Sequence, residues 1–330
     1  MPASGRRRVI ITDCNHGTIA PEREILGDIA EIELHQQNDE EGLLGFCLDA
    51  DGIITQYGAF TPRVLKALRR CQVICRYGVG VDTVDLAAAT EHGIIVAYVP
   101  DYCTDEVSNH AAALILALHR RLVPLNREVK VGHWEFRVAA PMARLRGQTL
   151  GIVGLGRIGL MLAEKLRPFG LTILAADPYR EDWPDWVRRV SLDELLAASD
   201  IVSLHSPLTD ETRHLINAAA LRRMKPSAFL VNTARGGVVD PEAIVQALRE
   251  NWIAGAALDV QEVEPMAAGH PLAGLDNVIL TPHAGWYSEG SIVELKRKVA
   301  TSVRRALEGQ IPAAVANPEV LNRPPWKGAR

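Results

Sequence analysis

Cysteine is sparse and scattered in this sequence. The 330 residues include five cysteines, and no two of them form a CxxC pair: Cys14, Cys47, Cys71, Cys75 and Cys103. An odd, scattered set differs from the paired framework of a disulfide-rich secreted domain, so the sequence predicts a reduced, cytoplasmic setting. Metal-ligand spacings such as HExxH are also missing, and we expect no metal site.

Long hydrophobic runs are absent as well. The longest, Ala111–Leu118, is eight residues of an alanine-rich segment, whereas about 20 apolar residues are needed to cross a bilayer. The arginines near the start are not followed by the apolar h-region of a signal peptide before Asp13. We therefore expect no secretory leader and no membrane partner.

A block of one charge sign is lacking too. The 36 basic and 40 acidic residues are mixed along the chain and leave a net charge of −4. The basic cluster Arg6–Arg8 is short, and we expect it to be a solvated segment that leads into the first strand candidate. We therefore expect no nucleic-acid partner. Hydrophobic residues make up 48% of the chain. This composition is typical of a globular protein, and the length predicts about two domains.

A glycine-rich turn organises what is present. The apolar segment Leu150–Val153 reads as a buried strand, and Gly154-x-Gly156-x-x-Gly159 leads from it into a helical pattern. The first glycine permits a tight turn, the second lets the backbone approach a pyrophosphate, and the third lets helix pack on strand. The helix N-terminus offers free N–H groups to phosphates. The motif predicts a dinucleotide site.

An aspartate follows the next strand candidate. Leu171–Ala175 is apolar, and Asp177 lies 18 residues after Gly159. A carboxylate at about this distance binds the ribose 2′-hydroxyl of NAD and repels a 2′-phosphate, so the sequence favours NAD as cofactor. Arg180 is close enough to leave NADP use open.

Strand candidates continue at regular intervals after this turn. Helical patterns separate most of six apolar segments: 150–153, 171–175, 201–204, 228–232, 255–258 and 278–280. Parallel strands with helical crossovers predict a doubly wound Rossmann domain. Residues 9–98 alternate in the same way over shorter segments, which predicts a second, smaller α/β domain.

The region before the glycine turn is expected to be helical and then irregular. Thr104 is expected to cap a long helix that ends at about Arg121, with acidic residues in its first turn and arginines in its last. Residues 124–147 show little periodicity. We expect them to form an arm or loop packed on another surface, such as that of another subunit.

Three residues that suit hydride transfer to a 2-oxo acid follow successive strands. Arg235, Glu264 and His283 come after the fourth, fifth and sixth strands of the predicted sheet, and ligands bind beyond these strand ends. A guanidinium can hold a carboxylate and polarise a carbonyl, and a histidine can deliver a proton near neutral pH. A carboxylate orients the imidazole, although Asp259 or Glu262 could equally be that partner.

These segments resemble the D-isomer-specific 2-hydroxyacid dehydrogenase family from Val9 to about Asn317. The most specific pieces are Arg76–Asp82, Gly154–Gly159, Asn232–Gly237, Glu264-Pro265 and Pro282-His283. The resemblance implies an NAD-dependent enzyme that interconverts a small 2-oxo acid and its D-2-hydroxy acid. It implies a Rossmann NAD-binding domain, residues 103–290, inserted in a smaller flavodoxin-like α/β substrate domain, residues 1–102 plus 291–330. It also implies a homodimer, paired through the cofactor domain's long helix and the arm after it.

The resemblance also implies roles for individual residues. Arg235 is expected to bind the substrate carboxylate and carbonyl, His283 to act as acid/base and Glu264 to be its partner. The substrate is expected to meet the loop Tyr77, Gly78, Val79 and Gly80, and Asp259 to meet the nicotinamide carboxamide. The remaining cofactor contacts are expected from Gly154, Gly156, Arg157, Ile158, Gly159, Asp177, His205, Pro207, Thr233, Ala234, Arg235, His283 and Gly285.

One segment is similar to the C-terminal binding protein branch of this family. That branch has a tryptophan three residues after the histidine, here Trp286, although Gly285 stands where it usually has alanine. Trp286 is expected to form an aromatic wall that favours a longer apolar 2-oxo acid, or else to fill a domain interface. Three alternatives stay open: an NADH-sensing dimeric interaction protein, a glyoxylate or hydroxypyruvate reductase, and a phosphoglycerate dehydrogenase.

Overall fold

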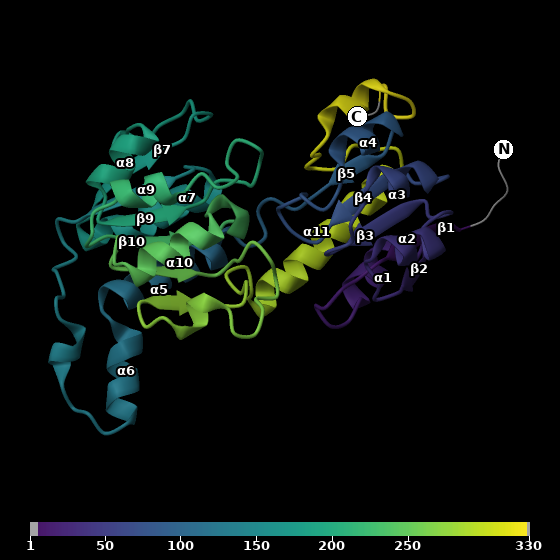
Figure 1. Cartoon of the computed structure of the whole chain (residues 1–330). Helices are drawn as coiled ribbons and strands as arrows, with labels where there is room; N and C mark the ends of the chain where they lie inside the picture. The colour runs from purple at the N-terminus through teal and green to yellow at the C-terminus, as the bar shows by residue number, and fades with distance from the viewer. Residues whose placement is uncertain (1–5, 329–330) are drawn as a thin grey trace. The chain divides into compact units, whose positions relative to one another are not determined.

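The chain folds into two compact units, each with its own parallel sheet (Figure 1). The structure, a computed structural model, describes residues 6–328. Unit 1 comprises residues 1–102 and 288–330, and unit 2 comprises residues 103–287. The chain therefore leaves unit 1 and later returns to it. It returns at Ser288, three residues before the predicted boundary; residues 1–5 and 329–330 of the predicted substrate domain lie outside the described residues.

Unit 1 is built on a five-stranded sheet in the order β2-β1-β3-β4-β5. All its strand pairs are parallel, and the order is that of flavodoxin-like folds. Its elements are β1 (Arg7–Ile11), α1 (Ala20–Leu26), β2 (Ala30–Leu34), α2 (Glu40–Phe46), β3 (Gly52–Thr55), α3 (Pro62–Ala67), β4 (Val73–Arg76), α4 (Leu86–Glu91), β5 (Ile95–Ala97), α11 (Glu289–Leu307) and η5 (Pro318–Asn322).

Helices cover both faces of this sheet. Leu43 of α2, Val64 of α3 and Ala89 of α4 pack in one buried cluster with Ile53 and Ile74 of the strands. On the other side α11, the long yellow helix of Figure 1, lies against β3 and β4 and beside α1. The contact is close, because a Cβ added to Gly52 would lie 3.1 Å from Cγ1 of Val303.

Unit 2 carries a seven-stranded sheet in the order β12-β11-β10-β9-β6-β7-β8, with every pair parallel. Its elements are α5 (Thr104–His119), α6 (Leu122–Lys130), η1 (Phe136–Ala139), β6 (Thr149–Val153), α7 (Arg157–Leu166), η2 (Arg167–Phe169), β7 (Thr172–Ala176), β8 (Arg188–Arg189), α8 (Leu192–Ala198), β9 (Ile201–Leu204), α9 (Ala218–Arg223), β10 (Phe229–Asn232), η3 (Gly236–Val238), α10 (Pro241–Arg249), β11 (Gly255–Leu258), η4 (Pro271–Gly274) and β12 (Val278–Leu280).

The strand order of unit 2 reverses at β6. The next strand in the chain, β7, lies on one side of β6, while β9 lies on the other. One hydrophobic cluster packs α5 and α7 on the sheet, and a second packs α8, α9 and α10 on it. This is a doubly wound Rossmann-type sheet, so the predicted fold class is confirmed. Ligands bind such sheets beyond the strand ends at the reversal point, which here lies next to the glycine turn.

Several local predictions need correction. The irregular segment expected from residue 124 is helical as far as Lys130, because Pro124 lies in the first turn of α6, where its missing N–H is not needed. Thr104 is the first residue of α5 and not its cap; the cap position is Cys103. The last helix begins at Glu289, inside the segment 103–290 predicted for the cofactor domain, because Ser288 and Ser291 form a capping box there.

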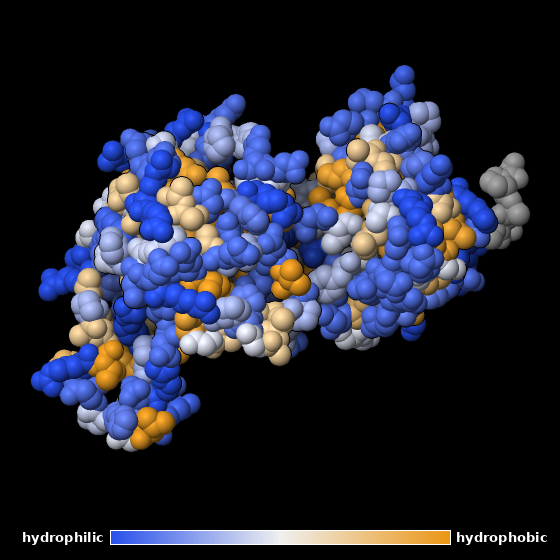
Figure 2. Space-filling view, in the orientation of Figure 1, coloured by the Kyte–Doolittle hydropathy of each residue, from blue (hydrophilic) through white to orange (hydrophobic). Residues whose placement is uncertain are grey.

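The segment formed by α6 and η1, which we call the arm, projects from the rest of unit 2 (Figure 1). No residue of α6 is buried. Large apolar side chains are exposed along the arm, and Figure 2 shows hydrophobic residues gathered on this projection. The exposed fractions reach 63% for Val131, 75% for Phe136 and 90% for Trp134. Exposed apolar side chains of this kind are typical of surfaces that contact another molecule.

Two further features concern the whole described chain. All five cysteines are unbridged, and four of them are buried. No helix within residues 6–328 is long and apolar enough to span a membrane.

Candidate active site

The glycine turn after β6 has the backbone that the motif requires. Gly154 has a φ of +88°, a conformation that L side chains rarely adopt. A Cβ on Gly159 would lie 2.4 Å from the carbonyl oxygen of Gly154, so only glycine allows this close packing of helix on turn. At Gly156 the space that a Cβ would occupy is open. The turn therefore leaves room for a ligand beside its middle glycine.

Unsatisfied polar groups of unit 2 also fit a dinucleotide. Helix α7 begins at Arg157 with Gly156 in the cap position, and this glycine has no side chain that could bond to the first N–H groups of the helix. Two buried hydroxyls, Oγ of Ser206 after β9 and Oγ1 of Thr233 after β10, have no hydrogen-bond partner among the described residues. Buried polar atoms usually do have partners. Like the glycine turn, both hydroxyls follow the carboxyl end of a strand and therefore lie at the same edge of the sheet. They suit hydrogen bonds to the polar groups of NAD.

Asp177 follows β7 and bonds to the glycine turn. Its Oδ2 accepts a hydrogen bond from the N–H of Leu155 at 2.9 Å, and its Oδ1 accepts one from Tyr179 at 3.0 Å. Arg180 donates through Nη1 to the carbonyl oxygen of Leu155 at 2.5 Å. Asp177 and Arg180, the two residues expected to influence the choice between NAD and NADP, therefore both bond to the backbone of Leu155.

His205 follows β9 and is neutral at physiological pH. Burial lowers its pKa to about 4, and its Nε2 lies 2.8 Å from Oγ of Ser203. A histidine without charge at pH 7 cannot serve as the acid, which agrees with a role in shaping the cofactor loop. Pro207, two residues on, is exposed, and its carbonyl oxygen accepts a hydrogen bond from Thr212 at 2.6 Å.

The loop after β10 presents Arg235. Asn232, at the end of the strand, stabilises this loop with two side-chain hydrogen bonds to its backbone. Its Nδ2 donates to the carbonyl oxygen of Arg235 at 2.9 Å, and its Oδ1 accepts from the N–H of Ala234 at 3.0 Å. A Cβ on Gly236 would lie 1.9 Å from the carbonyl carbon of Gln261. The loops after β10 and β11 thus touch, and Gly236 permits it.

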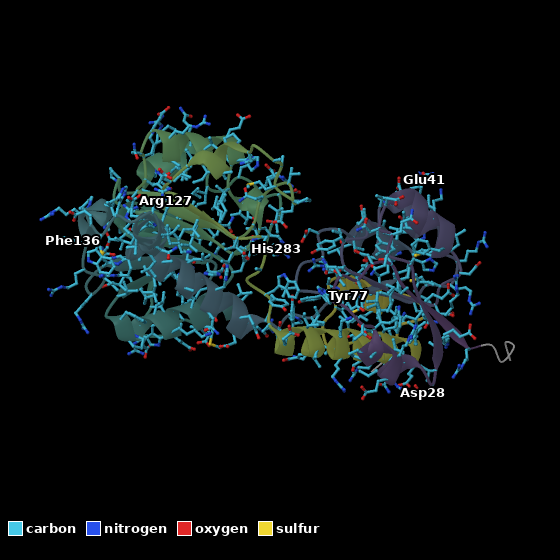
Figure 3. All side chains as sticks on the ribbon, turned by 90° about the horizontal axis from the view of Figure 1, so that it is seen from below. Asp28, Glu41, Tyr77, Arg127, Phe136 and His283 are labelled. Carbon is cyan, nitrogen blue, oxygen red and sulfur yellow. The ribbon has the colours of Figure 1, made fainter. Side chains whose placement is uncertain are left out.

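His283 and Glu264 form a direct pair. Nδ1 of His283 lies 2.7 Å from Oε2 of Glu264, and both side chains are about one-third exposed, at 33% and 35%. The other carboxylate oxygen of Glu264 accepts from the N–H of Gln261 at 2.9 Å. Figure 3 shows His283 on a loop at the edge of unit 2. With Nδ1 engaged, Nε2 is the ring nitrogen left for a substrate.

The electrostatics of this pair favour an ionised carboxylate. Burial opposes ionisation of Glu264, but the hydrogen bond and charge of His283, the N–H of Gln261 and the charge of Arg235 outweigh it. The pKa of Glu264 is therefore held below its usual value. Two of the predicted catalytic residues, His283 and Arg235, thus act on the carboxylate of the third, Glu264, the first by contact and the second through charge.

The structure also separates the three carboxylates that the sequence left as alternatives. Glu262 bonds to Arg213 at 2.9 Å and to His214 at 3.0 Å. Asp259 is buried and bonds to the backbone of the His283 loop. The His283 ring pairs with Glu264.

Asp259 holds the His283 loop in place. Its Oδ1 accepts from Ala284 at 2.9 Å, its Oδ2 from Gly285 at 2.8 Å, and its carbonyl oxygen from the N–H of His283 at 2.7 Å. His283 itself has a φ of +53°, which is unusual outside glycine. Burial alone would raise the pKa of Asp259, but hydrogen bonds from His110 and Thr281, with those from Ala284 and Gly285, lower it to about 2. The contact of Asp259 with the nicotinamide carboxamide stays a prediction.

Two residues of this arrangement were missed in the sequence. Nε2 of His110, on α5, lies 3.1 Å from Oγ1 of Thr281 and 3.3 Å from Oδ1 of Asp259. Thr281 donates to the same carboxylate oxygen at 2.6 Å. A Cβ on Gly285 would lie 2.9 Å from Oδ2 of Asp259 and 3.4 Å from Cδ2 of His110. The glycine that replaces the expected alanine therefore suits a loop packed tightly against Asp259 and His110.

The predicted substrate loop lies in unit 1, directly after β4. Tyr77 is buried, while Val79 and Gly80 are partly exposed. Gly78 has a φ of +143°, and a Cβ there would lie 1.9 Å from Nη1 of Arg76. In unit 2, Trp286 follows the His283 loop and packs edge-on against Tyr287, with ring centroids 5.8 Å apart.

Comparison with known proteins places these features in a family. Residues 112–285 match the model of the D-isomer specific 2-hydroxyacid dehydrogenase, NAD binding domain. The chain is 40% identical over 319 residues to a glyoxylate reductase of Thermofilum pendens, covering 91% of this chain and 92% of that protein. It is 44% identical over 271 residues to a glyoxylate reductase of Korarchaeum cryptofilum, covering 79% and 81%.

Solved structures agree. A D-lactate dehydrogenase from Aquifex aeolicus complexed with NAD and lactic acid superposes with a TM-score of 0.86 at 30% identity, over 94% of this chain and 99% of that one. An NADPH-dependent glyoxylate/hydroxypyruvate reductase from Sinorhizobium meliloti, in complex with NADP and malonate, gives a TM-score of 0.83 at 30% identity, over 95% and 98%.

Proposed function

The chain belongs to the D-isomer specific 2-hydroxyacid dehydrogenase family, and on that premise we propose that it reduces a short 2-oxo acid to its D-2-hydroxy acid with His283 as the proton donor. It is an oxidoreductase that acts on a CH–OH group, and it binds NAD. The observation that carries the proposal is the pair between Nδ1 of His283 and Oε2 of Glu264 at 2.7 Å.

The pair gives each residue a definite task. NADH, when bound, supplies the hydride that C2 of the 2-oxo acid receives. Nε2–H of His283 donates its proton to the carbonyl oxygen as that oxygen gains negative charge. Glu264 accepts from Nδ1–H and stabilises the charged imidazole before the proton leaves. Arg235 binds the substrate carboxylate through its guanidinium and polarises the carbonyl.

The size of the substrate is the finer part of the proposal. Glyoxylate reductases are the relatives at 40% and 44% identity, which supports glyoxylate or a similarly short 2-oxo acid. Trp286 supports a second candidate, a longer apolar 2-oxo acid, since its partly buried ring follows the His283 loop directly. A Trp286→Ala variant separates the two, because only a long substrate loses an aromatic contact.

The experiment is NADH oxidation, followed by absorbance, across 2-oxo acids from glyoxylate and hydroxypyruvate to phenylpyruvate, with NADPH in parallel. The wild-type protein should turn over at least one acid, and His283→Ala should lower kcat by a factor of 100 or more, about the usual worth of a general acid. His214→Ala is the matched control, because His214 also pairs with a glutamate, at 3.0 Å, in unit 2. Near-normal turnover by His283→Ala contradicts the proposal.

The arm supports a further part of the proposal, a homodimer. Its exposed apolar side chains, Val131, Trp134 and Phe136, offer a surface that a second copy would cover. A Trp134→Ser/Phe136→Ser variant should halve the mass measured by light scattering. Tyr179→Ser is the control, at a residue that is 77% exposed and does not belong to the arm, and it should leave the mass unchanged. Repeating the measurement with NADH tests the alternative of an NADH-sensing dimer.

A further inference from the structure

Unit 1 contains a buried charged cluster that the proposed reaction does not use. Nζ of Lys296, on α11, lies 3.1 Å from Oε1 of Glu22, on α1. The hydroxyl of Tyr77 donates to the same oxygen at 2.5 Å, and Nζ of Lys296 also lies 3.2 Å from Sγ of Cys14. The exposed fraction is 0% for Glu22, 1% for Lys296 and 2% for Tyr77. We call Lys296, Glu22, Tyr77 and Cys14 the Lys296 cluster.

Stability alone does not account for this cluster. Removing a lysine and a glutamate from water is costly, and apolar residues of similar size often serve a core as well or better. The second oxygen of Glu22, Oε2, is buried and has no hydrogen-bond partner among residues 6–328. An incompletely satisfied carboxylate adds to the cost. The groups are therefore better explained by what they hold than by the stability they provide.

What they hold is the first residue of the predicted substrate loop. Tyr77 directly precedes Gly78, and its N–H donates to the carbonyl oxygen of Thr55 at 2.8 Å. The carbonyl oxygen of Gly78 accepts from Val99 at 3.0 Å. The loop is thus tied to the sheet through its backbone at these two points. The side chain of Tyr77, labelled in Figure 3, ties the loop to Glu22 of α1 through its hydroxyl, and Glu22 in turn pairs with Lys296 of α11.

We propose that Glu22, held in place by Lys296, clamps the Tyr77 hydroxyl and so sets the position of the Gly78–Gly80 backbone, which makes Tyr77 a positioning residue for 2-oxo acid binding. The inference rests on the proposed function, because it assumes that this loop binds the substrate. It adds a specific determinant of substrate affinity that lies in the interior of unit 1 and touches no reacting atom.

The protonation of the neighbouring groups supports this arrangement. Burial and the carboxylate of Glu22 raise the pKa of Tyr77, so the hydroxyl keeps its proton and remains a donor. His16 packs edge-on against the Tyr77 ring, with centroids 5.7 Å apart. Burial, with the charges of Lys296 and Arg76, lowers the pKa of His16 to about 4. At neutral pH the ring beside Tyr77 is therefore uncharged, and Lys296 is the cation next to the Glu22 carboxylate.

The test is Tyr77→Phe, which removes only the hydroxyl. We expect KM for the best 2-oxo acid to rise on the order of tenfold, the effect of losing one hydrogen bond to a charged group. We expect kcat to stay within about twofold and the Kd for NADH to be unchanged, since the hydroxyl touches neither the pair of His283 and Glu264 nor the glycine turn Gly154–Gly159. Hydrogen–deuterium exchange of the peptide that covers residues 77–81 should increase severalfold.

Arg304→Met is the matched control. Arg304 joins the same two elements, α11 and the end of α1, through an exposed ion pair with Asp28 at 2.8 Å. It should leave both KM and the exchange of residues 77–81 as in the wild type. Lys296→Met, which leaves Glu22 buried without its cation, should raise KM in the same direction as Tyr77→Phe. If Lys296→Met unfolds, Tyr77→Phe still decides the question.

The outcomes separate the two proposals. A Tyr77→Phe protein with normal exchange at residues 77–81 overturns the clamp, whatever its kinetics. Increased exchange with an unchanged KM overturns the positioning role in substrate binding. A wild-type protein that turns over no 2-oxo acid sinks the proposed function instead, while the exchange data still decide whether the cluster holds the loop.

Discussion

The Glu264→Gln substitution offers a sharp test of the His283 pair. Glutamine keeps the size of the side chain and can still accept from Nδ1–H of His283, but it carries no negative charge. In the structure this carboxylate lies 2.7 Å from the imidazole and has its pKa held below the usual value, so it is ionised throughout the neutral range. The substitution therefore removes a charge and little else.

The expected loss follows from the type of bond. A hydrogen bond to a charged group contributes about 1.5 to 3 kcal/mol. His283 and Glu264 are 33% and 35% exposed, so solvent screens part of the interaction and the lower half of that range applies. Because glutamine still accepts the bond, the loss is the difference from a neutral hydrogen bond, about 1 kcal/mol in the transition state, which corresponds to about a fivefold decrease in kcat for reduction.

The assay is steady-state NADH oxidation at saturating cofactor, with single-turnover measurements to verify that the chemical step is the slow one. Glu262→Gln is the control, because Glu262 lies two residues away in the same loop and bonds to Arg213 and His214. It should change kcat by less than about threefold. The reasoning is refuted if Glu264→Gln keeps kcat within twofold of the wild type, or if Glu262→Gln loses as much.

Three further substitutions test other parts of the structure. His110→Ala should lower kcat about fivefold with an unchanged Kd for NADH, because it removes a hydrogen-bond partner of the group that holds the His283 loop. Asp177→Ala should shift the ratio of kcat/KM for NADPH over NADH at least about tenfold toward NADPH, since it removes a carboxylate expected to repel a 2′-phosphate. His205→Gln should change how stability depends on pH, because the pKa of His205 is lowered from 6.5 to about 4. The stability that comes from a neutral His205 in the folded state is complete above about pH 6.5 and is lost as the pH falls toward 4. Between pH 7 and 5 the free energy of unfolding, measured in urea, should therefore fall by about 1 to 2 kcal/mol more in the wild type than in the variant.

Each of these has its own control or contrary result. His119 is a buried histidine on the same helix as His110, so an equal loss of kcat in His119→Ala would point to general disturbance of α5. An unchanged cofactor preference in Asp177→Ala would mean that Asp177 does not meet the ribose. Parallel pH profiles for wild type and His205→Gln would show that His205 titrates alike in the folded and unfolded chain.

The fold could be predicted because its signals are local and repeated. Buried parallel strands appear as short apolar runs, and both sheets were expected from them. Helix starts are local as well: the side chain of Asp240 caps α10, and Ser191 and Glu194 form a capping box at the start of α8. The family, the enzyme class and NAD as cofactor are confirmed by the comparisons. The roles of the individual site residues remain predictions.

What was missed lacks such signals. Strand β8 is two exposed arginines, and its pairing with β7 depends only on backbone. Helix α2 has seven residues, two of them glycine. Helix α6 is nine residues long and buries no side chain, so no contact with a core marks it as helical. His110 lies 171 residues before its partner Thr281, and nothing at either position indicates the contact.

The split of unit 1 has a consequence for the order in which the chain can fold as it is synthesised. Unit 2 is one continuous stretch, so its sheet and both helix layers are complete once residue 287 has emerged from the ribosome. Unit 1 begins first and finishes last. Its strands must wait about 190 residues for Leu295, Val299 and Val303 of α11 to cover β3 and β4. During that interval an apolar sheet face stands open, which makes the nascent first hundred residues the segment with the greatest need for a chaperone.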